Sequence, residues 1–276
     1  MTTVIDYGSF RARLDAAKTT DARWRLLNAF QREWGLDIED ESGIGWIDDN
    51  RERLDELRDD PSSYDEDEDD DFEHVDLALE VPGALDEWWS LPFNSFVANP
   101  RFYWTHPIYP PSLEAGGGDE IDLTPGLFGT TDLRVCRFMA EYQYCNEWGY
   151  AAAHADLSDP PALVTADERW RVQARSLSEF FLLMAVVRLP RYVGWTAVPD
   201  RAAAPDPLPA LGFLPWRELG GNVTVHGAPD ALVYHDTADG SEQPLAVAAR
   251  TREALDGVAA RLGVTWKETA PPRHAT

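Results

Sequence analysis

The stretch "CRFMAEYQYCNEWGY", residues 136–150, starts as an apolar strand and then becomes crowded with polar and aromatic side chains. The segments around it, "LRVCRF" and "WGYAAAHA", predict two strands, with the crowded residues forming the turn between them. Glu141 and Gln143 lie where the first strand ends, among Tyr142, Tyr144 and Trp148. Because buried polar groups need hydrogen-bond partners, these two side chains either brace the turn internally or line a recognition surface.

Apolar residues at helical spacing predict helices before this stretch. One helix is expected over residues 7–35, where Gly35 ends it, and a second over "DDNRERLDELR", residues 48–58. A third helix opens at Pro82. The long segment 99–129 is rich in Pro and Gly and predicts irregular structure.

After this stretch, "ALVT" predicts another strand, and "SLSEFFLLMAVVRLP" predicts a buried helix. Ser176 and Glu179 have the spacing of a capping box at its start, and Pro190 is expected to stop it. The C-terminal part contains "ALVYHDT", "PLAVAAR", a helix ended by Gly263, and "VTW". This order predicts a strand–strand–helix–strand unit.

Together these patterns divide the chain into four segments. Residues 1–60 form an N-terminal helical segment, 61–73 an acidic flexible linker, 74–199 a core domain, and 200–276 a C-terminal α/β extension docked on the core. The expected fold class is α+β, with a mostly antiparallel twisted sheet, surrounding helices and a small C-terminal ββαβ extension.

The charge of the chain is strongly negative. Its 276 residues carry a formal net charge of −25. Ten of the acids lie within residues 59–73, so the rest of the chain still carries −15. Such a protein repels nucleic acids and anionic lipids, and it attracts a basic protein partner. The alternative interpretation is that the charge serves solubility, or that it reflects a host with a salty or acidic proteome.

The densest acidic run covers residues 65–71. It consists of Asp65, Glu66, Asp67, Glu68, Asp69, Asp70 and Asp71. Adjacent like charges neither pack nor pair locally, which predicts a solvated segment. Calcium-binding loops space their ligands and place a glycine at the turn, and this run has neither feature.

The sequence favours a cytoplasmic protein. Two cysteines, Cys136 and Cys145, form no disulfide framework and no CxxC metal pair. The N-terminus lacks the apolar core of a signal peptide. The most apolar segment, "FFLLMAVV", is far shorter than the ~18 residues that span a bilayer.

No strong catalytic motif is present. His154, Asp156 and Asp159 offer metal-ligand chemistry, but an Asp before two prolines is typical of a turn. Cys145 with His154 offers a nucleophile, although acidic surroundings raise a thiol pKa. His106, between aromatic residues and prolines, is interpreted as structural. We therefore expect no catalytic residues, no metal and no cofactor.

The order of the motifs resembles the SUKH superfamily, which includes bacterial immunity proteins and fungal cell-wall regulators. The resemblance covers residues 74–190. The residues that carry it are Val81, Pro82, Leu85, Trp88 and Trp89, then Phe138, Glu141, Gln143, Trp148 and Gly149, then Asp159, Pro160 and Pro161, and finally Ser176, Leu177, Phe180 and Phe181. The chain departs from the family pattern at Tyr142, where a smaller polar residue is expected.

The resemblance implies binding rather than catalysis. An immunity protein that neutralises a basic toxin domain, such as a nuclease, is the first hypothesis. Its expected contact residues are Trp104, Glu141, Tyr142, Gln143, Tyr144 and Trp148. A regulatory or scaffold protein that docks a partner through the acidic segment is the second hypothesis. An enzyme with an unusual site around His154, Asp156 and Glu141 is the third.

Overall fold

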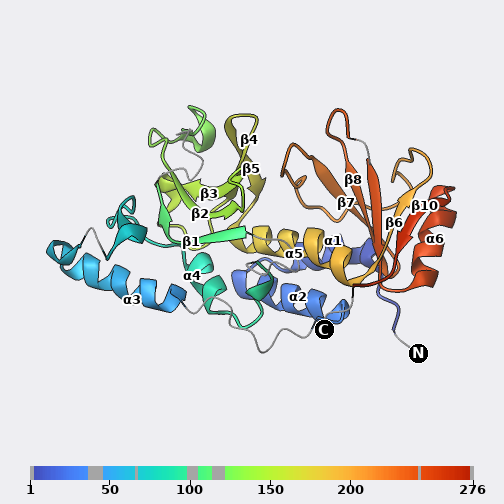
Figure 1. The fold of residues 1–276 in the computed structure, drawn as a ribbon, viewed down its shortest axis with the longest axis horizontal. Helices are drawn as coiled ribbons and strands as arrows, with labels where there is room; N and C mark the ends of the chain where they lie inside the picture. Colours follow the sequence, from blue (N-terminus) through green and yellow to red (C-terminus); the bar gives the residue numbers. More distant parts are fainter. Residues whose placement is uncertain are drawn as a thin grey trace. The chain divides into compact units, whose positions relative to one another are not determined.

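The computed structural model describes residues 3–36, 46–65, 68–97, 105–113, 122–241 and 244–273. Within these ranges the chain forms six α-helices and two five-stranded antiparallel sheets, so the predicted α+β class is confirmed (Figure 1). The chain divides into two compact units. Unit 1 combines Met1–Asp37 with Phe181–Thr276, and unit 2 is Ile38–Phe180. The predicted four-segment division stays a prediction, because compactness does not test which segments fold alone.

Unit 2 is built on a sheet whose strands follow one another in chain order. They are β1 (Thr105–Ser112), β2 (Val135–Glu141), β3 (Glu147–Ala151), β4 (Ala162–Ala166) and β5 (Arg169–Ala174). Every residue of β2 is buried. The strands expected around residues 136–150 and at "ALVT" are therefore present, whereas β5 was not predicted. The second of the expected strands ends early, because Ala152–His154 form a 3₁₀ turn.

Strand β1 lies in the segment expected to be irregular, so that expectation is wrong for residues 105–112. The strand contains three prolines, at 107, 110 and 111, which cannot donate backbone hydrogen bonds. It occupies the edge of the sheet and pairs only with β2, with a register shift between Pro107 and Ser112. An edge position is where a strand tolerates proline, since one side needs no donors.

The helices of unit 2 are α3 (Trp46–Asp59), α4 (Gly83–Ser90) and the first turn of α5 (Leu177–Val193). Helix α3 buries Leu54 and Leu57 against Phe72. The start of α5 places Phe180 against Phe138 and Trp148, with ring centroids 5.4 and 6.0 Å apart. The Ser176 hydroxyl accepts a hydrogen bond from the Glu179 amide at 3.2 Å, which confirms the Ser176 half of the predicted capping box. The Glu179 carboxylate pairs with Arg175.

The N-terminal part of unit 1 contains a break where one helix was predicted. A 3₁₀ turn (Tyr7–Ser9) and α1 (Phe10–Ala16) are followed by α2 (Thr20–Glu33). The Thr19 side chain accepts a hydrogen bond from the Ala22 amide at 3.2 Å and starts the second helix. A continuous helix would lose this cap. Gly35, at φ 76°, follows α2 as expected.

The sheet of unit 1 has the strand order β10-β6-β9-β8-β7. Its elements are β6 (Trp195–Pro199), β7 (Val223–Ala228), β8 (Ala231–Asp236), β9 (Leu245–Ala249), α6 (Arg252–Leu262) and β10 (Trp266–Ala270). The predicted C-terminal strand–strand–helix–strand order is confirmed as β8, β9, α6 and β10. Strands β6 and β7 were not predicted. Leu255 and Val258 of α6 pack on Val233, Val247 and Ala249 of the sheet.

Helix α5 runs through Pro190 to Val193, so the prediction that proline stops the helix is wrong. Proline has no amide hydrogen, and the carbonyl of Val186, four residues earlier, therefore lacks its helical donor. The Tyr234 hydroxyl of β8 donates a hydrogen bond to that carbonyl at 2.9 Å. A side chain from the sheet thus supplies the bond that the proline removes, and the helix continues.

Candidate functional site

The turn between β2 and β3 is braced by Glu141, whose side chain is 0% exposed. Its Oε2 accepts hydrogen bonds from the amides of Gln143 at 2.9 Å and Cys145 at 3.4 Å. Its backbone amide donates to the Asn146 carbonyl at 2.8 Å. The other oxygen, Oε1, is buried and has no hydrogen-bond partner among the residues described. The two hydrogen bonds that Oε2 accepts therefore fix the conformation of the turn.

The turn presents Tyr142, Gln143 and Tyr144 to solvent. The two tyrosines are substantially exposed, Tyr142 to 45% and Tyr144 to 39%. The Tyr144 ring stacks on His106 of β1 with centroids 5.6 Å apart and planes 7° apart. Tyr144 has a φ of 58°, a left-handed conformation that favours glycine. Its side chain is thus held in place while one face stays open.

The other predicted contact residues lie elsewhere. Trp148 is 0% exposed and packs against Phe180 in the core of unit 2. With Glu141 also buried, the exposed part of the predicted set narrows to Tyr142, Gln143 and Tyr144. Trp104 lies outside the described residues. The assignment of this set to partner binding stays a prediction.

The acidic run is not solvated throughout, and the prediction of a solvated segment is wrong for Asp69, which pairs with a distant residue. This side chain is buried and accepts hydrogen bonds from Arg53 Nε at 2.8 Å and Nη2 at 2.7 Å. These two bonds hold the pKa of Asp69 at about 2. Phe72, three residues later, is buried against Leu54 and Leu57.

The remaining acids of the run differ from Asp69. Asp65, Glu68, Asp70 and Asp71 are exposed, whereas Glu66 and Asp67 lie outside the described residues. The amide of Asn50 donates to Asp71 at 3.2 Å. The described part of the run is therefore attached to α3 at Asp69 and Phe72 and presents several carboxylates outward.

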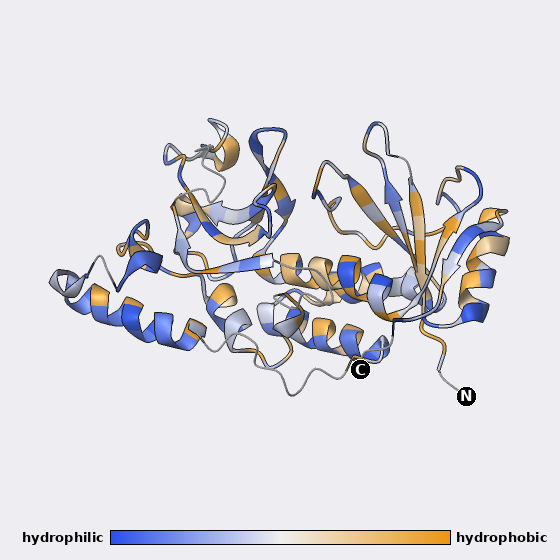
Figure 2. Ribbon diagram, in the orientation of Figure 1, coloured by the Kyte–Doolittle hydropathy of each residue, from blue (hydrophilic) through white to orange (hydrophobic). Residues whose placement is uncertain are grey.

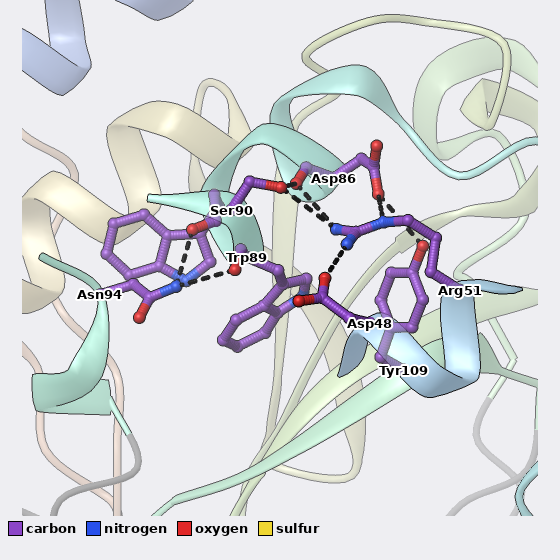
Figure 3. Close-up of polar contacts among 8 residues, drawn as sticks. Asp48, Arg51, Asp86, Trp89, Ser90, Asn94 and Tyr109 are labelled. Atoms are coloured by element: carbon purple, nitrogen blue, oxygen red, sulfur yellow. Dashed lines mark hydrogen bonds and ion pairs between the residues drawn. The ribbon is translucent and has the colours of Figure 1, made fainter. Parts of the chain in front are cut away.

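A second network joins α3 to α4 and β1 (Figure 3). Arg51 Nε donates to Asp86 Oδ1 at 2.7 Å, and the Tyr109 hydroxyl donates to the same oxygen at 3.1 Å. Arg51 also pairs with Asp48, and its guanidinium lies 5.6 Å from the centre of the Tyr109 ring. Burial, together with the charge of Asp86, raises the pKa of Tyr109 to about 12. These polar groups bind one another and connect α3, α4 and β1.

The three arginines of α3 all bind groups of unit 2. Arg51 reaches Asp86, Arg53 reaches Asp69, and Arg58 donates to the carbonyl of Leu79 at 2.7 Å. Their acidic neighbours point outward, with the side chains of Asp48, Asp55 and Glu56 between 66 and 77% exposed. Figure 2 shows α3 as mainly hydrophilic. Sequence reasoning missed this role, although Arg51 and Arg58 share a helical face with Leu54.

The net charge is divided unequally between the two units. Unit 2 contains 34 Asp and Glu against nine Arg and no Lys, which accounts for the whole −25. Unit 1 contains 15 acids and 15 Lys or Arg, and its net charge is zero. The excess negative charge of the chain is therefore confined to unit 2.

The residues considered for metal binding and catalysis lie in different environments. Asp159 accepts hydrogen bonds from the Ser178 amide at 2.9 Å and hydroxyl at 2.6 Å at the start of α5. The His154 ring packs against Phe128, with centroids 4.9 Å apart, and Asp156 is exposed. In the described ranges no group of three or more His, Cys, Asp or Glu is placed to hold a metal. Cys136 is buried and Cys145 exposed.

No helix in the described part of the chain has the length and apolar character needed to cross a bilayer.

Comparison with known proteins identified no relative of this chain. No family model, no curated protein and no solved structure matches this chain. The resemblance to the SUKH superfamily therefore rests on the quoted residues.

Proposed function

We propose that this chain is a non-catalytic protein-binding domain, of the immunity type that the SUKH resemblance implies, and that unit 2 binds a basic partner such as a toxin domain. One observation carries the proposal: the entire charge of −25 belongs to unit 2, whose helical arginines bind its own acceptors. Uncompensated carboxylates attract a basic protein and accelerate its association.

The aromatic turn supplies the short-range part of this proposed interface. Exposed Tyr142 and Tyr144 offer the large, rigid contact area that is typical of interface hot spots. Stacking on His106 and the brace from Glu141 order the turn before binding. A pre-ordered turn loses little conformational entropy when a partner covers it.

A regulatory or scaffold protein that docks its partner through the acidic segment is the second candidate. It is favoured by the exposed Glu68 and Asp70, which lie on a segment anchored at Asp69 and Phe72. Deleting the whole segment would also remove these anchors and the packing on α3. The substitution pair Glu68→Gln and Asp70→Asn removes charge and keeps both anchors.

The test starts with the partner captured from the native host, identified by mass, and then compares variants by binding kinetics. We expect Tyr142→Ala with Tyr144→Ala to raise the dissociation rate at least roughly tenfold. Glu68→Gln with Asp70→Asn should lower mainly the association rate. The control for the tyrosine variant is Leu157→Ala, which removes another exposed apolar side chain of unit 2. The control for the acidic variant is Asp206→Asn with Asp239→Asn, which removes two negative charges from unit 1.

The outcomes separate the two candidates. Loss of binding in the tyrosine variant, with the controls unchanged, supports an interface on the folded surface. Loss of binding in the acidic-segment variant alone favours the docking segment. A captured protein whose binding responds to neither variant contradicts both candidates.

A further inference from the structure

Helix α6 of unit 1 borders an apolar groove that stays open among the residues the structure describes. The groove has a volume of about 290 Å³, and its apolar walls are Val4, Ala228, Pro229, Ala254 and Val258. Val4 is 65% exposed in this position, on the N-terminal segment that pairs with Asp230. An apolar groove with a large exposed aliphatic side chain is a surface suited to protein contact.

Gly257, in the middle of α6, is one of the residues that line this groove. Glycine weakens a helix interior compared with alanine. Gly257 does not have the left-handed conformation that would require glycine, and a Cβ atom added there meets no atom of the described residues within 4 Å. The fold of the chain itself therefore gives no reason for glycine at this position, whereas close approach of another helix would.

Charged residues flank Gly257 symmetrically. Glu253 lies four residues before it and Arg261 four residues after it, on the same side of the helix, and both line the groove. Both are exposed, and no ion pair within the described residues involves either of them. Two helices that cross antiparallel at Gly257 place Glu253 of each beside Arg261 of the other.

We propose that α6 forms a two-fold symmetric contact with α6 of a second copy of this chain. The helices cross at Gly257, and the ridge formed by every fourth residue of each helix packs along the groove of the other. Glu253 pairs with Arg261 of the second copy, twice by symmetry. The aliphatic surface of Val4 is covered by the second copy.

The charge distribution favours a second copy on this face. Two molecules that each carry −25 repel one another strongly if their acidic units meet. Unit 1, with 15 acids and 15 bases, has no net charge. For an interface of one helix pair and a groove we expect a buried area below the standard of about 1,600 Å², and hence weak self-association.

Sedimentation velocity of the full chain, from about 1 µM to about 1 mM, tests this proposal. We expect a monomer–dimer equilibrium. Glu253→Arg alone and Arg261→Glu alone each turn two attractive pairs into repulsive ones and should raise the dimer Kd roughly tenfold. The double variant E253R/R261E should restore the wild-type Kd. Gly257→Leu should remove dimerisation.

The double variant excludes a simpler explanation for the two charges. An acid in the first turn and a base in the last turn also complement the helix dipole. The double variant makes that interaction unfavourable and yet restores pairing between copies, so rescue of the dimer identifies the intermolecular contact. Circular dichroism of each variant checks that α6 still folds. A wild-type monomer at all concentrations, or single variants without effect on Kd, would overturn the proposal.

Discussion

Unit 1 and unit 2 have similar architectures and very different surfaces. Each contains a five-stranded antiparallel sheet with α-helices. Each also contains an arginine–glutamate pair with little exposure: Arg188 with the partly buried Glu218 at 2.9 Å in unit 1, and the buried Arg137 with Glu147 at 3.2 Å in unit 2. Yet one unit is neutral and the other carries −25. Since a neutral unit builds the same class of sheet, the fold does not require the excess charge.

The largest effect is expected from a substitution in the core of unit 2. It tests whether the stability of this unit depends on Trp148. Trp148→Ala removes a fully buried side chain in contact with Phe180. We expect the free energy of unfolding of unit 2 to fall by about 3–5 kcal/mol. Denaturant titration measures this loss, and hydrogen exchange shows whether it lies in unit 2. Tyr144→Ala, on the exposed face of the same turn, should cost less than about 1 kcal/mol. Equal losses would contradict the division into core and surface.

The corresponding test in unit 1 concerns Tyr234. Tyr234→Phe leaves the Val186 carbonyl buried without a donor, because residue 190 is proline. We expect a loss of about 1–3 kcal/mol in the free energy of unfolding. Pro190→Ala restores a helical amide, so Tyr234→Phe should cost less in that background. An equal cost in both backgrounds would show that the two residues act independently.

Salt should affect the two units differently. Charges interact over about 30 Å at 0.01 M salt and over only about 3 Å at 1 M. Screening relieves self-repulsion in unit 2, whereas unit 1 has no excess charge to screen. We expect hydrogen exchange to slow with added NaCl in β2 and β3 more than in β8 and β9. The same response in both sheets would show that the unequal charge has no effect on stability.

A more local test concerns the attachment of the acidic segment. The pKa of Asp69 is about 2, below its ordinary value of 3.8, and the main cause is hydrogen bonding from Arg53. The ionised form is favoured in the folded state, so this contribution to stability is present above pH 3.8 and is lost as the pH falls toward 2. Arg53→Ala should return the pKa of Asp69 toward 3.8, measured by NMR titration of the carboxyl carbon. An unchanged pKa would mean that Arg53 does not hold the segment.

The smallest expected effect concerns the reactivity of the two cysteines of unit 2, Cys136 and Cys145, toward a labelling reagent. Cys136 is buried, and burial raises the pKa of its thiol to about 12, whereas Cys145 is exposed on the turn. Since the thiolate is the reactive form, iodoacetamide at pH 8 should modify Cys145 and leave Cys136 unmodified. Cys145→Ser should then remove all labelling of the folded protein, as read by mass spectrometry. Labelling of Cys136 under these conditions would show that β2 opens.

The amino-acid sequence determined the elements whose stabilising pattern is local. The spacing of Leu54 and Leu57, the cap at Ser176 and the glycine at 263 each act within a few residues. The helix of the two leucines, the start of α5 and the end of α6 were accordingly found where expected. The α+β class and the C-terminal strand–strand–helix–strand order followed from the same local signals.

Only the tertiary structure decided which side chains are buried and which hydrogen-bond partners they have. Trp148 and Tyr144 lie four residues apart in one polar-aromatic stretch, yet one is core and the other surface. Asp69 lies in an acidic run, and its burial depends on Arg53, sixteen residues away. Likewise, α5 passes Pro190 because Tyr234 of a distant strand donates the missing hydrogen bond. Burial and hydrogen-bond partners depend on contacts between distant segments, and local residue patterns do not contain that information.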